Sequence, residues 1–214
     1  MIGADLLSRR RLAVLSEGFS ATAEAVRQLR TALFLRPHEE SLRSLLLTPA
    51  SHGVEAAVLA ANLGVSLAQT GRPVVLVDAD LREPALHSLL AAPNDAGLTS
   101  ALAEKGGAPL PVRDTGVASL RLLTAGPPVA QAGALLDAAE LARVLEELRD
   151  GDGALVAVTS PAHLYADAAI LAPHFGGVVL VVVPGVSQQA HIKQARQALA
   201  QAGAAMVGVA IVER

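Results

Sequence analysis

Residues 44–63 of the chain read SLLLTPASHGVEAAVLAANL. The apolar run Leu45–Thr48 predicts a buried strand, and the alanine- and leucine-rich run Glu55–Gln69 predicts a helix. The loop between them contains Gly53 and leads into the helix N-terminus, where backbone N–H groups can hold a phosphate. This order of strand, glycine-containing loop and helix predicts the first unit of an α/β protein with a phosphate-binding corner.

The loop lacks the side chains that phosphate chemistry requires. In a Walker A motif a lysine neutralises the phosphates, and the next residue, a serine or threonine, holds Mg²⁺. Here the lysine position is Ala56 and the hydroxyl position is Ala57, while Glu55 adds a negative charge beside the pocket. We therefore expect no nucleotide and no metal at this loop. The positions that form this degenerate phosphate-binding loop are Gly53, Glu55, Ala56, Ala57 and Val58.

Apolar runs recur along the chain with helical stretches between them. Valine and leucine crowd these runs without alternation, which is typical of parallel strands covered on both faces. The expected strands are Leu45–Thr48, Pro73–Val77, Ser119–Thr124, Ala154–Thr159, Gly177–Val183 and Ala205–Val212. The expected helices are Ala21–Leu35, Glu55–Gln69, Pro84–Leu90, Ala138–Arg149, Ala166–Leu171 and Gln188–Gln201. The alternation predicts a doubly wound, mainly parallel sheet with helices on both faces.

Composition limits the class of protein. The 214 residues suit a single α/β domain, predicted over residues 19–214 after an N-terminal extension of residues 1–18. Hydrophobic residues make up 52% and aromatic residues 2%, so the core must be aliphatic. The absence of cysteine excludes disulfides and thiolate metal sites, and a net charge of −3 argues against nucleic acid as a partner. No apolar run resembles a signal peptide or a membrane span, so we expect a cytoplasmic protein.

Five further segments carry a family resemblance because they occur in a fixed order. They are EAVRQLRT (24–31), VLVDADLREP (75–84), NDAGLT (94–99), LTAGP (123–127) and ADAAILAP (166–173). Together they resemble the bacterial tyrosine-kinase family of capsule and exopolysaccharide synthesis. These are P-loop proteins related to the MinD/ParA ATPases, and they act with a membrane-embedded chain-length regulator. The resemblance runs from about Phe19 to Val212 and implies a P-loop NTPase-like fold of the MinD/ParA type.

Two other elements also depart from the family pattern. The family's Walker B strand ends in an aspartate, where this chain has Thr159, and its last strand ends in an asparagine that contacts adenine, where this chain has Val212. Family kinases also carry tyrosines after the last strand, whereas this sequence ends at Arg214. Its single tyrosine, Tyr165, is interpreted as a packing residue, so we expect no self-phosphorylation on a tail.

Asp78 and Asp80 are the remaining acidic pair of the site. The resemblance implies that such residues serve magnesium and the acceptor hydroxyl. The interpretation that we favour is structural: both carboxylates accept hydrogen bonds from loop amides and cap the helix near Pro84, with Arg82 as their ion-pair partner. His52 and His163 flank the same loops, and surface or capping roles are favoured for both.

The helix Ala21–Leu35 contains the functional motif that matches the family pattern most completely. At about 100° per residue, Glu24, Arg27 and Arg30 fall on one arc, and the apolar residues fall on another. The resemblance implies that this motif meets a neighbouring subunit in a ring, so we expect the charged arc to be an interface that is free for a partner. Arginines at positions 9–11 are expected to add contacts either to acidic lipid headgroups at the inner face of the membrane or to an acidic partner.

These observations predict a catalytically inactive pseudokinase that works as a scaffold or regulatory subunit. The expected partners are further copies of the chain, an active paralogue, or the cytoplasmic segment of a chain-length regulator. One alternative is a weak ATPase or tyrosine kinase that uses ATP and Mg²⁺ with Asp78 and Asp80, although Lys105 and Lys193 are the only lysines. The other is a MinD/ParA-like positioning protein that no longer cycles.

Overall fold

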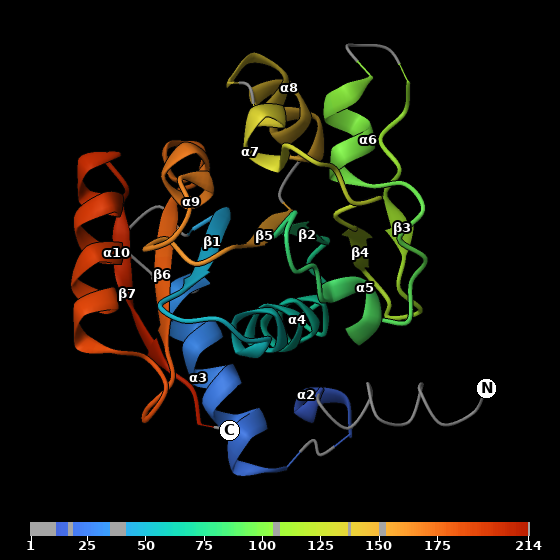
Figure 1. Cartoon of the computed structure of the whole chain (residues 1–214). Coiled ribbons are helices and arrows are strands. Elements are labelled where there is room, and N and C mark those ends of the chain that lie inside the picture. The colour runs from blue at the N-terminus through green and yellow to red at the C-terminus, as the bar shows by residue number, and fades with distance from the viewer. Residues whose placement is uncertain are drawn as a thin grey trace.

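The computed structural model describes residues 12–16, 19–34, 42–104, 108–136, 138–149 and 153–213. Its centre is a seven-stranded sheet in the order β3-β4-β2-β5-β1-β6-β7, parallel except for β3, which pairs antiparallel with β4 (Figure 1). The strands are β1 (Ser44–Pro49), β2 (Val74–Ala79), β3 (Arg113–Asp114), β4 (Leu120–Leu123), β5 (Ala154–Thr159), β6 (Gly177–Val182) and β7 (Met206–Ile211). The predicted doubly wound, mainly parallel sheet is confirmed.

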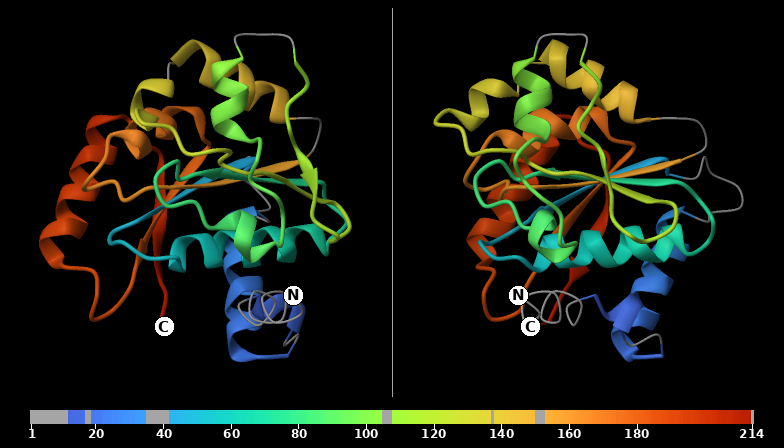
Figure 2. Two further views of the ribbon diagram at one scale, coloured as in Figure 1. Left: turned by 45° about the vertical axis from the view of Figure 1, so that its right-hand side comes forward. Right: turned by 90° about the vertical axis from the view of Figure 1, so that its right-hand side faces the viewer.

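Helices cover both faces of the sheet (Figure 2). One face carries α2 (Ala13–Ser16), α3 (Ala21–Phe34), α4 (Glu55–Ala68) and α5 (Leu86–Leu89). The other carries α6 (Leu98–Ala103), α7 (Ala132–Leu135), α8 (Ala138–Leu148), α9 (Asp167–Leu171), η1 (Ala172–His174) and α10 (Gln189–Gln201). The sequence missed β3, α2, α6, α7 and η1, because elements of two to six residues are too short to show a period.

The core is aliphatic, as the composition predicted. Every residue of β1, β2 and β5 is buried, because these strands occupy the centre of the sheet. Helix α4 lies so close to β2 that a Cβ on Gly64 would stand 2.8 Å from Leu76 Cδ2. A larger side chain at this position would require the Leu76 side chain or the helix to shift.

Part of the proposed N-terminal extension packs on the domain. Leu12 and Val14 are buried in the same apolar cluster as α3 and α4, and the Val14 N–H donates to Asn62 Oδ1 at 3.2 Å. The domain boundary at residue 18 stays a prediction, and the arginines at positions 9–11 lie outside the described residues.

Candidate functional site

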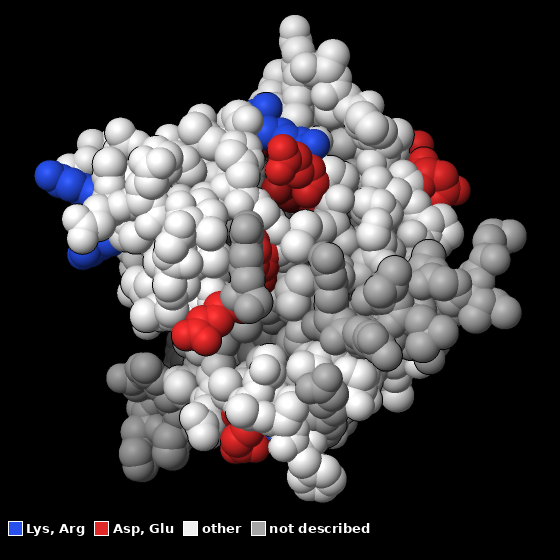
Figure 3. All heavy atoms as spheres, turned by 60° about the horizontal axis from the view of Figure 1, so that its bottom comes forward, with Lys and Arg blue, Asp and Glu red and all other residues white. Residues whose placement is uncertain are grey.

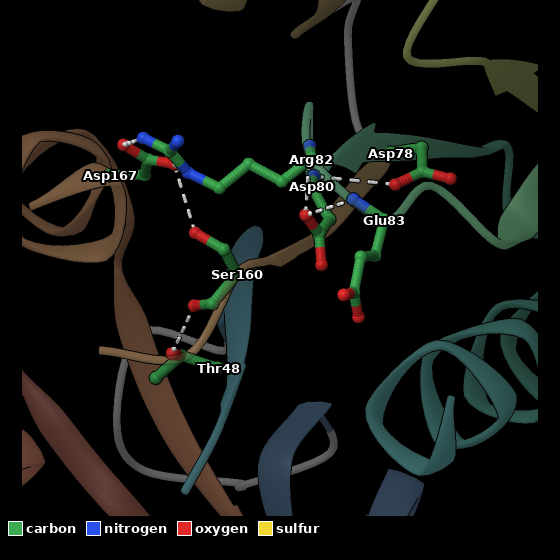
Figure 4. A network of polar contacts seen from close by, with 7 residues as sticks. All are labelled: Thr48, Asp78, Asp80, Arg82, Glu83, Ser160 and Asp167. Carbon is green, nitrogen blue, oxygen red and sulfur yellow. Dashed lines mark hydrogen bonds and ion pairs between the residues drawn. The ribbon is translucent and has the colours of Figure 1, made fainter. Parts of the chain in front are cut away.

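The carboxyl ends of β1, β2 and β5 bring three loops together at one edge of the sheet (Figure 4). Thr48, in β1, donates its hydroxyl to the Ser160 carbonyl at 3.1 Å and so ties the first strand to the loop after β5. In open parallel sheets this edge is where ligands bind. The three loops therefore form the candidate site.

The loop after β1 turns into α4 at Gly53, whose φ of 141° suits glycine but strains other residues. Helix α4 then starts at Glu55, and its first-turn residues Ala56 and Ala57 are 1% and 5% exposed. Both alanines belong to the apolar cluster beneath the sheet. The hydroxyl of Ser51 lies 2.9 Å from that of Ser187, which joins this loop to the segment before α10.

Asp78 is completely buried at the end of β2. Its Oδ2 accepts the Ala85 and Leu86 N–H groups at 3.0 and 2.8 Å, and its Oδ1 accepts the Asp80 N–H at 3.3 Å. Burial raises the pKa of Asp78 to about 7, although these hydrogen bonds act in the opposite direction. The carboxyl group thus satisfies the amides at the start of α5.

Asp80 serves the adjoining turn. Its Oδ1 accepts the N–H groups of Arg82 and Glu83 at 3.1 and 3.0 Å, and burial raises the pKa of Asp80. The predicted hydrogen bonds are present, because each carboxyl accepts loop amides and Asp78 caps the helix that follows Pro84. That the pair is only vestigial for catalysis stays a prediction.

The predicted partner of Arg82 was wrong. Its Nε and Nη2 donate to Oδ2 and Oδ1 of Asp167, at the start of α9, at 3.0 and 3.2 Å. The Asp167 side chain is 2% exposed and also accepts the Ser160 hydroxyl at 2.9 Å. The guanidinium lies 3.9 Å from the centre of the Tyr165 ring. Asp167 offers a paired, charge-assisted geometry that the neighbouring aspartates, already occupied by backbone amides, do not.

Thr159 occupies the position where the family pattern has its Walker B aspartate. The residue is fully buried at the end of β5, and its Oγ1 has no hydrogen-bond partner among the described residues. A threonine in this place brings no charge that could hold Mg²⁺.

Three histidines, His52, His163 and His191, lie at the same edge. The rings of His163 and His191 stack with their centres 4.2 Å apart, and His52 Nδ1 lies 3.5 Å from Glu83 Oε2. Burial, together with His191 and His52, lowers the pKa of His163. The sequence placed His52 and His163 here but missed His191, which lies far along the chain on α10. Within the described residues no group of three His, Cys, Asp or Glu side chains has a metal-binding arrangement.

The charged arc of α3 is only partly available to a partner. Arg27 Nε pairs with Glu24 Oε2 at 3.1 Å on the helix surface. Arg30, however, donates from Nη1 to the Ser66 carbonyl at 2.8 Å and to the Ser66 hydroxyl at 3.3 Å. The interface at Glu24, Arg27 and Arg30 therefore stays a prediction, and the Arg30 guanidinium also reaches across to α4.

A mainly parallel sheet with a glycine turn after β1 and two aspartates at the carboxyl end of β2 defines a P-loop NTPase-like protein. A search against protein-family models finds no match. The chain is 30% identical to the tyrosine-protein kinase YwqD of Bacillus subtilis over 94% of its length and 84% of that protein's. It is 28% identical to the putative tyrosine-protein kinase CapB of Staphylococcus aureus, over 90% and 84% of the two chains.

Solved structures agree with these relatives. The kinase domain of Escherichia coli tyrosine kinase ETK is 26% identical and superimposes with a TM-score of 0.87, over 95% of this chain and 80% of that one. Pyrococcus horikoshii MinD, at 23% identity and a TM-score of 0.63 over 78% and 68% of the chains, shares the fold. The chain belongs to the bacterial tyrosine-kinase family of capsule and exopolysaccharide synthesis, and it shares its fold with MinD.

Searching the described residues for a helix long and apolar enough to cross a bilayer finds none.

Proposed function

We propose that this chain is a catalytically inactive member of its family that acts as a scaffold or regulatory partner in polysaccharide synthesis and export. The observation that carries the proposal is the first turn of α4. Where a phosphate-binding helix needs a lysine and a hydroxyl, the chain has Ala56 and Ala57, both buried in the apolar cluster.

The described residues at the carboxyl ends of β2 and β5 supply no replacement for the missing lysine and hydroxyl. Arg82 is engaged by Asp167, Asp78 by the amides of α5, and Thr159 carries no charge. Loss of a single preorganised charge stabiliser typically costs about 10²–10³ in rate. Several such losses at one site leave too little transition-state stabilisation for phosphoryl transfer.

The partners that we propose follow from the family. They are further copies of the chain, an active paralogue, and the cytoplasmic segment of a membrane chain-length regulator. This assignment places the protein in the cytoplasm, at the inner face of the membrane when its partner holds it there. The net charge of −3 gives nucleic acid no attraction to the protein as a whole.

Calorimetric titration tests the proposal. With Mg²⁺ present, millimolar ATP or ADP should give no saturable heat, because the loop offers no cation to the phosphates. The kinase domain of ETK, titrated in the same buffer, is the positive control. A dissociation constant in the low micromolar range would contradict the proposal and would favour a weak enzyme that uses Asp78 and Asp80.

The α3 surface gives a second test. Arg27→Glu should weaken self-association or partner binding and leave the melting temperature unchanged, because Arg27 and Glu24 form an ion pair at the surface.

Arg30→Ala should instead lower stability by about 1–3 kcal/mol, since it removes charged hydrogen bonds to Ser66. Light scattering and thermal melting separate the two effects. If Arg27→Glu assembles like the parent, α3 is not the interface.

A further inference from the structure

Two helices of the described chain carry the largest net charges, and these charges have opposite signs. Helix α8, AAELARVLEEL, contains three glutamates and one arginine. Helix α10, QAHIKQARQALAQ, contains one lysine, one arginine and no acidic residue. The net charge of the whole chain is −3, so α10 is a positive surface on a weakly acidic protein. Opposite charges on two helices of one chain allow two copies of that chain to attract each other.

Both helices hold charges that no described residue neutralises. The side chains of Lys193 and Arg196 on α10 are exposed, and neither makes a hydrogen bond or an ion pair with a described residue. On α8, Arg143 bonds Glu140 and Glu147. Glu146 is exposed and has no such partner among the described side chains. These charges are therefore available for a contact with another molecule.

The cations of α10 lie in a groove that follows one face of the helix. The groove has a volume of about 490 Å³, and Met206 of β7 forms part of its wall. Its α10 residues recur at intervals of three and four, as neighbours on one helix face do. They are Gln189, Ile192, Lys193, Arg196, Gln197 and Ala200. A straight groove along a helix, partly apolar and bordered by charge, has the shape that accepts a second helix.

The outer face of α8 carries a stripe that matches this groove. Ala139, Ala142 and Glu146 are three and four positions apart, so they lie on one side of the helix. The opposite side is buried in the core through Leu141, Val144, Leu145 and Leu148. Alanines at a helix contact let the two helix axes approach closely. The stripe of α8 thus offers small apolar side chains with carboxylates at its border.

Helices α8 and α10 lie on different sides of the molecule. In Figure 1 α8 is at the top and α10 at the left-hand border. Figure 3 shows positive side chains at this same border. Because the two surfaces face different directions, α8 of one copy can meet α10 of the next, and each copy keeps its second surface for a further copy. Contacts of this head-to-tail kind build rings or filaments.

We propose that this chain assembles head to tail, with the acidic outer face of α8 in one copy bound in the α10 groove of the next. Glu146 and its neighbour Glu147 pair with the two cations of the groove, and the alanines of α8 pack against its apolar lining, Ile192 and Ala200. Exposed ion pairs contribute little individually, so the charges mainly fix the register while the apolar stripe supplies contact area. Helix α3 takes no part, and its charged arc then serves a partner other than this chain.

The inference rests on the proposed function only in that a scaffold assembles with further copies of itself. Nucleotide titration and self-assembly are separate measurements. Saturable ATP binding would overturn the inactive-kinase proposal and leave the α8–α10 contact standing. A chain that stays monomeric would overturn the contact alone, because the scaffold proposal also includes an active paralogue and a membrane regulator.

Charge reversal tests the contact by light scattering on the full chain. Reversal on α8, by Glu146→Lys with Glu147→Lys, should weaken self-association about tenfold, and so should reversal on α10, by Lys193→Glu with Arg196→Glu. Combining all four changes should restore self-association, because the two surfaces are again opposite in charge. The control Arg121→Glu reverses an exposed cation on β4 and should assemble like the parent. Thermal melting checks that each variant is folded, as expected for exposed positions.

The absence of cysteine from the sequence allows a second, independent test. One variant carries Ala142→Cys on α8, and another carries Gln197→Cys on α10. A short bismaleimide should link the two variants in a mixture but neither variant to itself, because a head-to-tail contact never brings the same position of two copies together. A linked dimer of one variant alone, no link in the mixture, or failure of the fourfold charge variant to reassemble would each overturn the proposal.

Discussion

Replacing Asp78 by asparagine should remove most of the decline in unfolding free energy that we expect for the parent protein as pH rises from about 4 to about 7. The Asp78 carboxyl is fully buried, and its pKa is raised from 3.8 to about 7. Between these two values the folded protein holds a proton that the unfolded chain has released. The contribution of Asp78 to stability is therefore fully present below pH 3.8, the pKa in the unfolded chain, and is lost as pH rises through about 7, the pKa in the folded protein.

The size of this effect follows from the pKa difference. A shift of this extent corresponds to a stability change on the order of 4 kcal/mol across the interval. Asparagine has no titrating proton, and its Oδ1 can still accept the Ala85 and Leu86 amides. The variant should thus resemble the parent near pH 4 and exceed it above pH 7. A weaker slope should remain, because the pKa of Asp80 is raised as well.

Urea unfolding at a series of pH values measures this slope directly. Asp114→Asn, which alters an exposed carboxyl on β3, is the matched control and should keep the slope of the parent. Parallel curves for the parent and Asp78→Asn would contradict the argument, and would mean that Asp78 is ionised throughout.

The buried pattern of the sheet was readable from the sequence because each central strand is an uninterrupted apolar run. The predicted strand Ala154–Thr159 is β5 as observed. Strand β3 was not predicted, because Arg113 and Asp114 are both charged and form no apolar run. The two residues form a strand only because they pair with β4. Tertiary pairing, and not local preference, forms such an element.

The same limit applied to the candidate site. Asp78 and Asp80 bond amides within eight residues, so sequence reasoning could assign their capping role. Arg82 lies 85 positions from Asp167, and Arg30 lies 36 from Ser66. Nothing in a single sequence ranks such distant partners against nearer ones. For Arg82 the nearer expectation, Asp78 or Asp80, was wrong, and for Arg30 the contact with Ser66 was not foreseen.

The Arg82–Asp167 pair should give the largest effect of any surface-accessible side chain in the site. Arg82→Ala leaves the Asp167 carboxylate, 2% exposed, without its cation and with only the Ser160 hydroxyl as a described side-chain partner. Breaking a buried pair from one side costs about 3–5 kcal/mol, and the lower end applies because the Arg82 side chain is 32% exposed. Arg82→Lys should restore little of the stability that Arg82→Ala loses. The lysine ammonium group cannot bond both carboxylate oxygens in one plane, and it cannot stack on the Tyr165 ring as a flat guanidinium does.

A double-mutant cycle separates the pair from general damage. If the cost of Arg82→Ala comes from the stranded carboxylate, Asp167→Asn should relieve part of it, and the double variant should be less destabilised than the sum of the singles by about 1–3 kcal/mol. Arg143→Ala is the matched control, because that side chain is also 32% exposed but bonds Glu140 and Glu147, which are 24% and 47% exposed. Its loss should have a much smaller effect, since water can solvate the glutamates that remain. Additive losses in urea unfolding would show that Arg82 and Asp167 contribute independently, and the network would then not hold the loops after β2 and β5 together.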